Sequence, residues 1–276
     1  MSAVPSTERL FALSAFEGVR LIRIYAAKHP VVPLEELLPI IEHIEADARD
    51  LDLRASAYLH EIVALECPVE GRGFYQACIS AVVTKHQPNW CKAMTQGRMR
   101  FLASLSQNDR DVFVAAGLTN EPPTIDVVNW WDTVAGFARM LADLGKMEQA
   151  RKAEALSMEH ERQRLKSLGI KMQPEWKGLD DNFAGYDVLS YDLGEFAPTS
   201  RMIEVKSTVA SPLRFIVSRN EWEQAMKVGS AYLFHIWDMQ RIPAVLYERT
   251  CAQVAAHIPT DNEKGKWKAA EIPLGL

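Results

Sequence analysis

The sequence predicts a mixed α/β protein, in which an all-helical N-terminal region precedes a smaller α/β domain with a mixed central sheet. From Thr7 to about Leu118, apolar residues recur with the period of a helix. Beyond Gly169 the period of the apolar residues changes to two, which is typical of strands. The segment "TNEPPTID" at 119–126 contains two prolines and is the best candidate for a linker between the two parts.

The N-terminal part contains a series of amphipathic segments, each predicted to be a helix. In 9–30, for example, Leu10, Leu13, Phe16 and Val19 follow a helical period, and Pro30 marks the end. A polar cluster that resembles a helix cap precedes the last segment, 106–118. The predicted helices cover 9–30, 33–50, 51–66, 73–86, 92–105 and 106–118.

The C-terminal part is expected to begin with helices and to continue as an α/β sandwich. We expect a helix over 127–145 and a second helix over 146–169, closed by Gly169. The predicted strands cover 185–193, 201–208, 213–218, 230–239 and 242–248, with a helix over 219–229 that ends at Gly229. The predicted division is a helical region over 1–120, a connecting helix over 121–146 and an α/β domain over 147–276.

The composition is that of a globular protein outside the membrane. Of 276 residues, 48% are hydrophobic and 24% are charged. No apolar run approaches the ~20 residues that span a bilayer, and the N-terminus lacks the pattern of a signal peptide. We therefore expect a cytoplasmic protein. Four cysteines without metal-ligand spacing are expected to be reduced thiols in the core: Cys67, Cys78, Cys91 and Cys251.

The negative charge of the chain is confined to its first part. The net charge is −5, and the segment from residue 151 onward is neutral, with equal numbers of basic and acidic residues. An acidic surface is poorly suited to binding phosphates. We therefore expect any nucleic-acid contact to lie in the C-terminal part, and the helical region to dock a protein partner.

The predicted strand "RMIEVKST" at 201–208 carries an acid and a base on one face. Glu204 and Lys206 are two positions apart, so their side chains point to the same side. Asp187 lies in the preceding predicted strand and can meet Glu204 at one end of the sheet. These two carboxylates and the carbonyl of Val205 are hard oxygen ligands suited to Mg²⁺ or Mn²⁺. Lys206 would then orient a metal-bound water or stabilise charge on a phosphate.

A third acid is predicted on the helix before the first strand. The stripe from Glu154 continues through Met158, Glu161, Leu165 and Leu168, and we expect it to face the sheet. Glu154 could therefore complete the site. Four basic residues are placed on the opposite faces of this helix: Lys152, Arg162, Arg164 and Lys166.

Each of these candidates also has a structural interpretation. Glu204 and Lys206 could form a solvated pair at a sheet edge. Asp187 could cap a turn after Gly185, and Glu154 could belong to a salt-bridged helix face. Three other side chains are expected to have structural roles: His235 as a hydrogen-bonded strand residue, and Trp130 and Trp131 in packing.

Taken together, these motifs resemble a known family. "KAEALSMEHERQRLKSLGI", "GYDVLSYDLG", "RMIEVKST" and "FIVSRNEWEQAMKVGSAYLFHIWDM" are similar to the domain at the C-terminus of the plant protein NO VEIN, which also occurs in many prokaryotic proteins. That domain is placed in the PD-(D/E)XK nuclease superfamily. The resemblance covers roughly residues 147–250 and implies a restriction-endonuclease-like α/β/α fold. The N-terminal part resembles no family in this way.

The resemblance assigns roles to several residues. It implies that Asp187 and Glu204 are metal ligands, that Lys206 is the catalytic lysine and that Glu154 is the helix acid. Ser218, Asn220 and Glu221 match a later motif to which no chemical role is assigned. The chain departs from the family pattern at two positions, where Tyr186 replaces the proline of the superfamily name and Ala153 replaces a frequent glycine.

The sequence therefore predicts a Mg²⁺-dependent nuclease that hydrolyses phosphodiester bonds, with DNA as the expected substrate and RNA as an open alternative. Such domains occur in prokaryotic restriction and anti-phage systems, which implies a role in antiviral defence by association only. The rival hypothesis is a catalytically silent module that binds nucleic acid or partner subunits within a larger complex.

Overall fold

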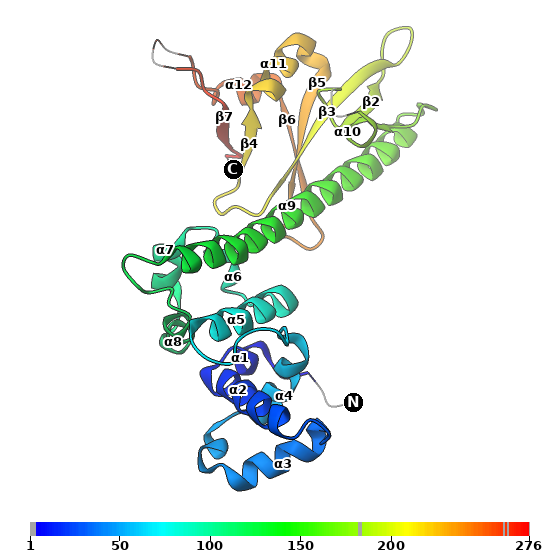
Figure 1. Ribbon diagram of the computed structural model, residues 1–276. Helices are drawn as coiled ribbons and strands as arrows, with labels where there is room; N and C mark the ends of the chain where they lie inside the picture. Colours follow the sequence, from blue (N-terminus) through cyan, green and yellow to red (C-terminus); the bar gives the residue numbers. More distant parts are fainter. Residues whose placement is uncertain (1–3, 182–183, 262, 264, 276) are drawn as a thin grey trace. The chain divides into compact units, whose positions relative to one another are not determined.

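The chain divides into two compact units in the computed structural model, which describes residues 4–181, 184–261, 263 and 265–275. The units are Met1–Asp143 and Leu144–Leu276. The long helix α9 (Ile125–Ser167) contributes its first half to one unit and its second half to the other (Figure 1).

The first unit consists of helices packed around an aromatic core. Phe16, Phe74, Phe101 and Phe113 are fully buried there. Trp131 is also buried and Trp130 packs against the same cluster, so both tryptophans have the packing role that the sequence predicts. The elements are α1 (Thr7–Leu10), α2 (Leu13–Lys28), α3 (Leu34–Ile44), η1 (Ala46–Asp50), α4 (Leu53–Ile62), α5 (Arg72–His86), α6 (Cys91–Met94), α7 (Arg98–Ser104), α8 (Gln107–Ala115) and the start of α9.

Several helix boundaries differ from the predicted ones. The predicted helix over 92–105 is two short helices, α6 and α7, because Gly97 between them has a positive φ of 93°. Conversely, the two helices predicted over 127–145 and 146–169 are one helix, α9. Gly145 lies inside it, since one glycine costs only about 1 kcal/mol in a helix of otherwise favourable residues. Gly169 does end the helix as predicted, with a φ of 71°.

The second unit contains a mixed sheet of five strands, which confirms the predicted fold class. The strand order is β1-β2-β3-β5-β6, in which β3 and β5 are parallel and the other neighbours are antiparallel. The strands are β1 (Glu175–Trp176), β2 (Val188–Asp192), β3 (Thr199–Thr208), β5 (Tyr232–Asp238) and β6 (Val245–Thr250). The predicted strands over 185–193 and 201–208 are therefore neighbours, with Val188 opposite Ile203.

Layers of different kinds cover the two faces of this sheet (Figure 1). On one face, Ala153 of α9 packs against Ile203 and Val205 of β3. On the other face, Tyr232 and Phe234 of β5 pack against a second, smaller layer. That layer consists of β4 (Arg214–Ser218), α11 (Arg219–Val228), α12 (Cys251–Ala255) and β7 (Ala269–Pro273).

Part of the second layer differs from the prediction. The predicted strand over 213–218 exists as β4, but it pairs with β7 in a separate two-stranded sheet. We did not predict β7, because its segment "AAEIP" is short and mostly exposed. The sequence also gave no signal for β1, for α12 or for the short helix α10 (Lys177–Asp180), since each is too short to display a period.

Two further expectations concern the membrane and the cysteines. Within the part of the chain that the structure describes, no helix is both long and apolar enough to cross a lipid bilayer. All four cysteines are free thiols, as predicted. Cys78 and Cys91 are buried, whereas Cys67 and Cys251 are half-buried.

Candidate active site

Strand β3 divides its side chains between the two faces of the sheet. Ile203 and Val205 point towards α9, while Glu204 and Lys206 point towards the layer that contains α11. The Lys206 ammonium lies 2.8 Å from Glu204 Oε1, so the predicted same-face placement is present. Glu204 is buried and the side chain of Lys206 is only 19% exposed. The pair is therefore not a solvated ion pair at an exposed edge of the sheet.

Asp187 directly precedes β2 instead of lying inside it. Its Oδ2 accepts a hydrogen bond of 2.7 Å from the backbone amide of Val205, and its own amide donates to the carbonyl of Ile203. These bonds hold the carboxylate beside β3. Burial raises the pKa of Asp187 to about 6, and the nearby charge of Glu154 adds to this effect.

Gly178 of α10 leaves room for the Asp187 carboxylate. Its amide donates to the Asp187 carbonyl at 2.9 Å. A Cβ atom at this position would lie 2.7 Å from Asp187 Oδ1 and 3.2 Å from Asp187 Cα. Any larger residue would therefore displace the carboxylate.

Glu204 has the most strongly shifted carboxyl group of the site. Burial raises its pKa to about 8, and the charges of Asp187 and Glu221 contribute, although Lys206 opposes the shift. Its second oxygen accepts a hydrogen bond of 3.2 Å from the hydroxyl of Tyr232. That hydroxyl also lies 3.0 Å from the carbonyl of Gly185. The sequence did not identify Tyr232 as part of the site.

Glu221 of α11 also contacts the lysine. Its Oε2 lies 2.8 Å from Lys206 Nζ, so Lys206 bridges two carboxylates. Although burial opposes them, the two carboxylates raise the pKa of Lys206, which keeps the ammonium protonated. The family resemblance includes Glu221 in a later motif but assigns it no role, so the sequence does not predict this contact with Lys206. The Ser-x-x-Glu spacing of that motif could have identified Glu221 as a helix-capping residue.

Glu154 has a different environment. It is buried on the α9 side of the sheet, where Trp176 Nε1 and Arg151 Nη1 donate to its Oε2 at 2.5 Å and 2.8 Å. Its charge reaches Asp187, but it does not lie on the face of Glu204 and Lys206. Among the described residues, no three side chains of His, Cys, Asp or Glu are grouped so as to hold a metal ion. The structure places Asp187, Glu204 and Lys206 close to one another, and Glu154 acts on this group through its charge near Asp187.

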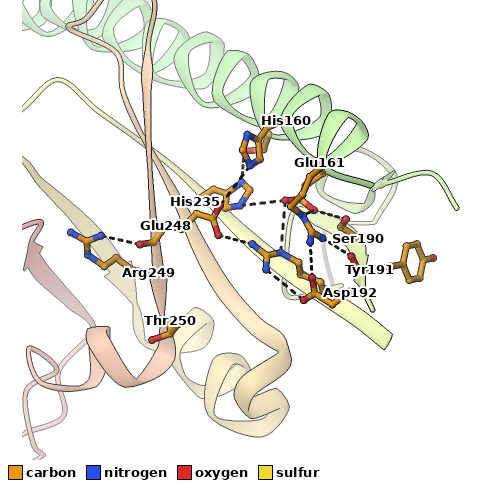
Figure 2. A network of polar contacts seen from close by, with 12 residues as sticks. His160, Glu161, Ser190, Tyr191, Asp192, His235, Glu248, Arg249 and Thr250 are labelled. Atoms are coloured by element: carbon orange, nitrogen blue, oxygen red, sulfur yellow. Dashed lines mark hydrogen bonds and ion pairs between the residues drawn. The ribbon is translucent and has the colours of Figure 1, made fainter. Parts of the chain in front are cut away.

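A second polar cluster lies between α9 and the sheet (Figure 2). Its centre is Glu161, which is fully buried, as expected for the predicted stripe. Ser190 Oγ and Arg164 Nε donate to Glu161 Oε2 at 2.5 Å and 2.8 Å. The helical period predicts Arg164 on the opposite face of the helix. Its long side chain instead reaches around the helix to the buried acid and to Asp192.

His235 lies in the same cluster. It is fully buried, and its Nδ1 lies 3.2 Å from Ser157 Oγ, as expected for a hydrogen-bonded strand histidine. Burial lowers its pKa to about 3, so the ring is neutral at pH 7. His235 Nε2 and Arg201 Nε lie 3.8 Å and 3.7 Å from Glu161 Oε1, too far for hydrogen bonds. This cluster fixes α9 to the sheet.

One family model matches the second unit. The model described as "Protein NO VEIN, C-terminal" matches residues 153–248, which is less than half of the chain. The matched segment begins next to Glu154 and includes Asp187, Glu204, Lys206 and Glu221. No curated protein and no solved structure matches the chain.

Proposed function

We propose that the second unit is a metal-dependent nuclease that hydrolyses phosphodiester bonds of DNA. The observation that carries the proposal is the convergence of two carboxylates with the ammonium of Lys206: Asp187 directly precedes β2, and Glu204 lies beside Lys206 in the neighbouring strand β3. The resemblance of the surrounding segment to the PD-(D/E)XK superfamily, and its match to the NO VEIN C-terminal model, support the same chemistry.

The donor atoms suit Mg²⁺ or Mn²⁺. Asp187, Glu204 and the Val205 carbonyl would supply hard oxygen ligands, and Mg²⁺ commonly uses one or two carboxylates together with waters and substrate phosphates. The raised pKa values of Asp187 and Glu204 support this fit, because each carboxylate is buried and lies near other acidic side chains. A divalent cation would compensate their negative charge. When bound, such an ion activates water and neutralises charge on the phosphate.

The remaining residues act by position and charge. Lys206 carries a proton that its two carboxylate neighbours stabilise, so its role is that of a cation facing the phosphate and not of a base. Tyr232 orients Glu204 through the hydroxyl contact to Oε2. Glu154 acts on the site through its charge near Asp187, and Trp176 and Arg151 hold it in place.

The wider role follows by analogy. We propose a restriction-endonuclease-like domain that serves in a prokaryotic restriction or anti-phage system and works in the cytoplasm. The support is the resemblance alone, because function resides in a site and not in a fold. The helical region is proposed to bind a basic protein partner, since the first 150 residues carry the whole net charge of −5.

A second candidate function is a catalytically silent module that binds nucleic acid or partner subunits. The observation in its favour is that Lys206 already forms ion pairs with both Glu204 and Glu221 in the protein by itself. In that case the three charges would form a structural ion-pair network within the sheet layer.

Incubation of the purified protein with plasmid DNA and with RNA, in the presence of Mg²⁺, Mn²⁺ or EDTA, distinguishes these functions. We expect metal-dependent cleavage of DNA that EDTA abolishes. The matched control is Lys206→Ala, prepared in the same way, so that cleavage by a contaminant would persist in it. Absence of cleavage by the wild-type protein under all conditions would favour the silent module.

A further inference from the structure

Glu221 is the third residue of α11, and its own carboxylate makes two kinds of contact. Its Oε2 accepts a hydrogen bond of 2.9 Å from the backbone amide of Ser218, whose hydroxyl in turn accepts from the Glu221 amide at 3.3 Å. This reciprocal arrangement is a capping box. The same oxygen lies 2.8 Å from Lys206 Nζ. A residue with a purely capping role would need only the first contact.

The lysine between Glu204 and Glu221 has four rotatable side-chain bonds, so its ammonium needs more than one anchor to stay in one place. One anchor, Glu204, is a proposed metal ligand. When that carboxylate binds a cation, its negative charge is shared and the cation repels the ammonium. Glu221 is the only other carboxylate that forms an ion pair with Lys206 among the described residues.

We propose that Glu221 is a positioning residue that holds Lys206 in place for the phosphate while Glu204 binds the metal. This inference rests on the proposed nuclease function. Charge balance supports it, because three carboxylates, Asp187, Glu204 and Glu221, match one ammonium plus one divalent cation. The capping box supports it as well, since Ser218 fixes the Glu221 carboxylate to the start of a helix. The adjacent Asn220 is exposed.

The substitution Glu221→Gln tests the negative charge of Glu221 without removing its contribution to the helix cap. Glutamine serves in capping boxes as glutamate does, so the variant keeps an acceptor for Ser218 and removes only the negative charge. We expect a melting temperature close to that of the wild type, an unchanged KM and a kcat lowered at least about tenfold, up to the ~10²–10³ loss typical of removing an oriented donor outright. Ser218→Ala is the opposite control, because it removes the hydroxyl that caps the helix but keeps the Glu221 charge and the backbone amide of residue 218 that holds the carboxylate. It should melt at a lower temperature and keep its kcat.

Calorimetric titration with Mn²⁺ provides a readout that does not depend on cleavage. In Glu221→Gln, Lys206 has Glu204 as its remaining carboxylate partner and competes with the ion, so Mn²⁺ affinity should fall several-fold. In a Lys206→Met background the same substitution should reduce affinity less, because no ammonium competes. A double-mutant cycle measures this difference. Equal losses in both backgrounds would mean that Glu221 does not act through Lys206, and would overturn the inference.

The experiment separates failure of this inference from failure of the proposed function. If the wild-type protein binds Mn²⁺ and cleaves DNA, but Glu221→Gln matches it in kcat and in Mn²⁺ affinity, Glu221 is only a cap. If the wild-type protein neither binds Mn²⁺ nor cleaves DNA, the nuclease proposal itself is wrong, and the positioning role is overturned with it.

Discussion

Lys206 lies 2.8 Å from Glu204 in the same strand, with both side chains on the face of the sheet that α11 covers. A pair of opposite charges with so little exposure has either a catalytic or a structural role. Removing one member of a buried ion pair typically costs about 3–5 kcal/mol of stability, because the other charge is left without a partner. The two roles therefore predict different behaviour when either residue is replaced.

Replacing each residue by alanine should separate their roles in metal binding. Glu204→Ala should abolish both Mn²⁺ binding and cleavage, because Asp187 and one carbonyl are too few strong ligands for a divalent ion. Lys206→Ala should abolish cleavage and retain Mn²⁺ binding, since every ligand remains. Calorimetric titration with Mn²⁺ and a melting curve for each variant provide the measurement. Equal destabilisation of both variants, with no Mn²⁺ binding by the wild type even when DNA is present, would indicate a structural ion pair.

Gly178→Ala should damage the site without removing any charged group. The added methyl group would lie 2.7 Å from Asp187 Oδ1, and the nearby Asp187 backbone limits how far the side chain can retreat. We expect Mn²⁺ affinity and cleavage to fall by about tenfold or more, in keeping with the sensitivity of catalysis to small displacements. Unchanged Mn²⁺ affinity in a folded Gly178→Ala variant would show that the position of Asp187 is unimportant.

Gly145→Ala is a matched glycine substitution with the opposite expected effect. Gly145 lies inside α9, and among the residues that the structure describes no atom beyond the adjacent helix backbone lies within 4 Å of the added Cβ. Alanine is favoured over glycine in a helix interior by about 1 kcal/mol. Denaturant unfolding should therefore give a higher free energy of unfolding, and cleavage should be unaffected. Destabilisation would argue against the continuous helix.

His235 should make stability depend on pH. Its pKa is about 3 in the folded protein and about 6.5 in an unfolded chain. Between these values the unfolded chain binds a proton that the folded protein does not. The free energy of unfolding should therefore fall as the pH falls from about 6.5, by at most about 1.4 kcal/mol per pH unit.

Comparison with His235→Gln isolates this effect, because glutamine does not titrate. The charged and titratable groups around the ring are the same in both proteins: His160, Glu161, Arg164, Arg201 and Glu248. The difference between the two stability curves, measured with denaturant from about pH 7 to pH 4, should grow as the wild type loses stability on acidification. Parallel curves would mean that the ring is not kept neutral by burial.

The helical region should contribute little to nucleic-acid affinity. Its negative charge opposes phosphates, whereas the part from residue 151 onward is neutral overall. We expect a fragment that contains residues 144–276 to bind DNA about as tightly as the full chain at the same salt concentration. Fluorescence anisotropy with labelled DNA measures both affinities, and circular dichroism checks that the fragment is folded. Much weaker binding by a folded fragment would assign DNA contacts to the helical region.

Local sequence patterns were sufficient to predict features that depend on residues close together in the sequence, such as the face of a strand or the buried side of a helix. The alternation within "RMIEVKST" placed Glu204 and Lys206 on one face, and the helical stripe placed Glu154 and Glu161 in buried positions. Contacts between distant segments could not be obtained in this way. The ion pair of Lys206 with Glu221 depends on how α11 packs over β3, and no periodicity in either segment encodes that packing.

The same limit explains two differences in the fold. Strand β4 was identified by composition, but its partner β7 lies more than fifty residues later in the chain, so their separate sheet was not predicted. Glu154 was correctly placed on the inner side of its helix, yet the periodicity could not tell which face of the sheet that helix covers. Because α9 covers the face opposite to Glu204, Glu154 and Glu204 lie on different sides of the sheet.

The parallel pairing of β3 with β5 also determines when the site can form during protein synthesis. Asp187, Glu204 and Lys206 leave the ribosome well before Tyr232, which begins β5 and contacts Glu204. Between them the chain must complete β4 and α11, which carries Glu221. Until then the edge of β3 has no partner on this side, and Glu204 lacks its hydroxyl contact. A chain that ends before Tyr232 therefore carries Asp187, Glu204 and Lys206 but lacks the strand and the hydroxyl contact that complete their surroundings.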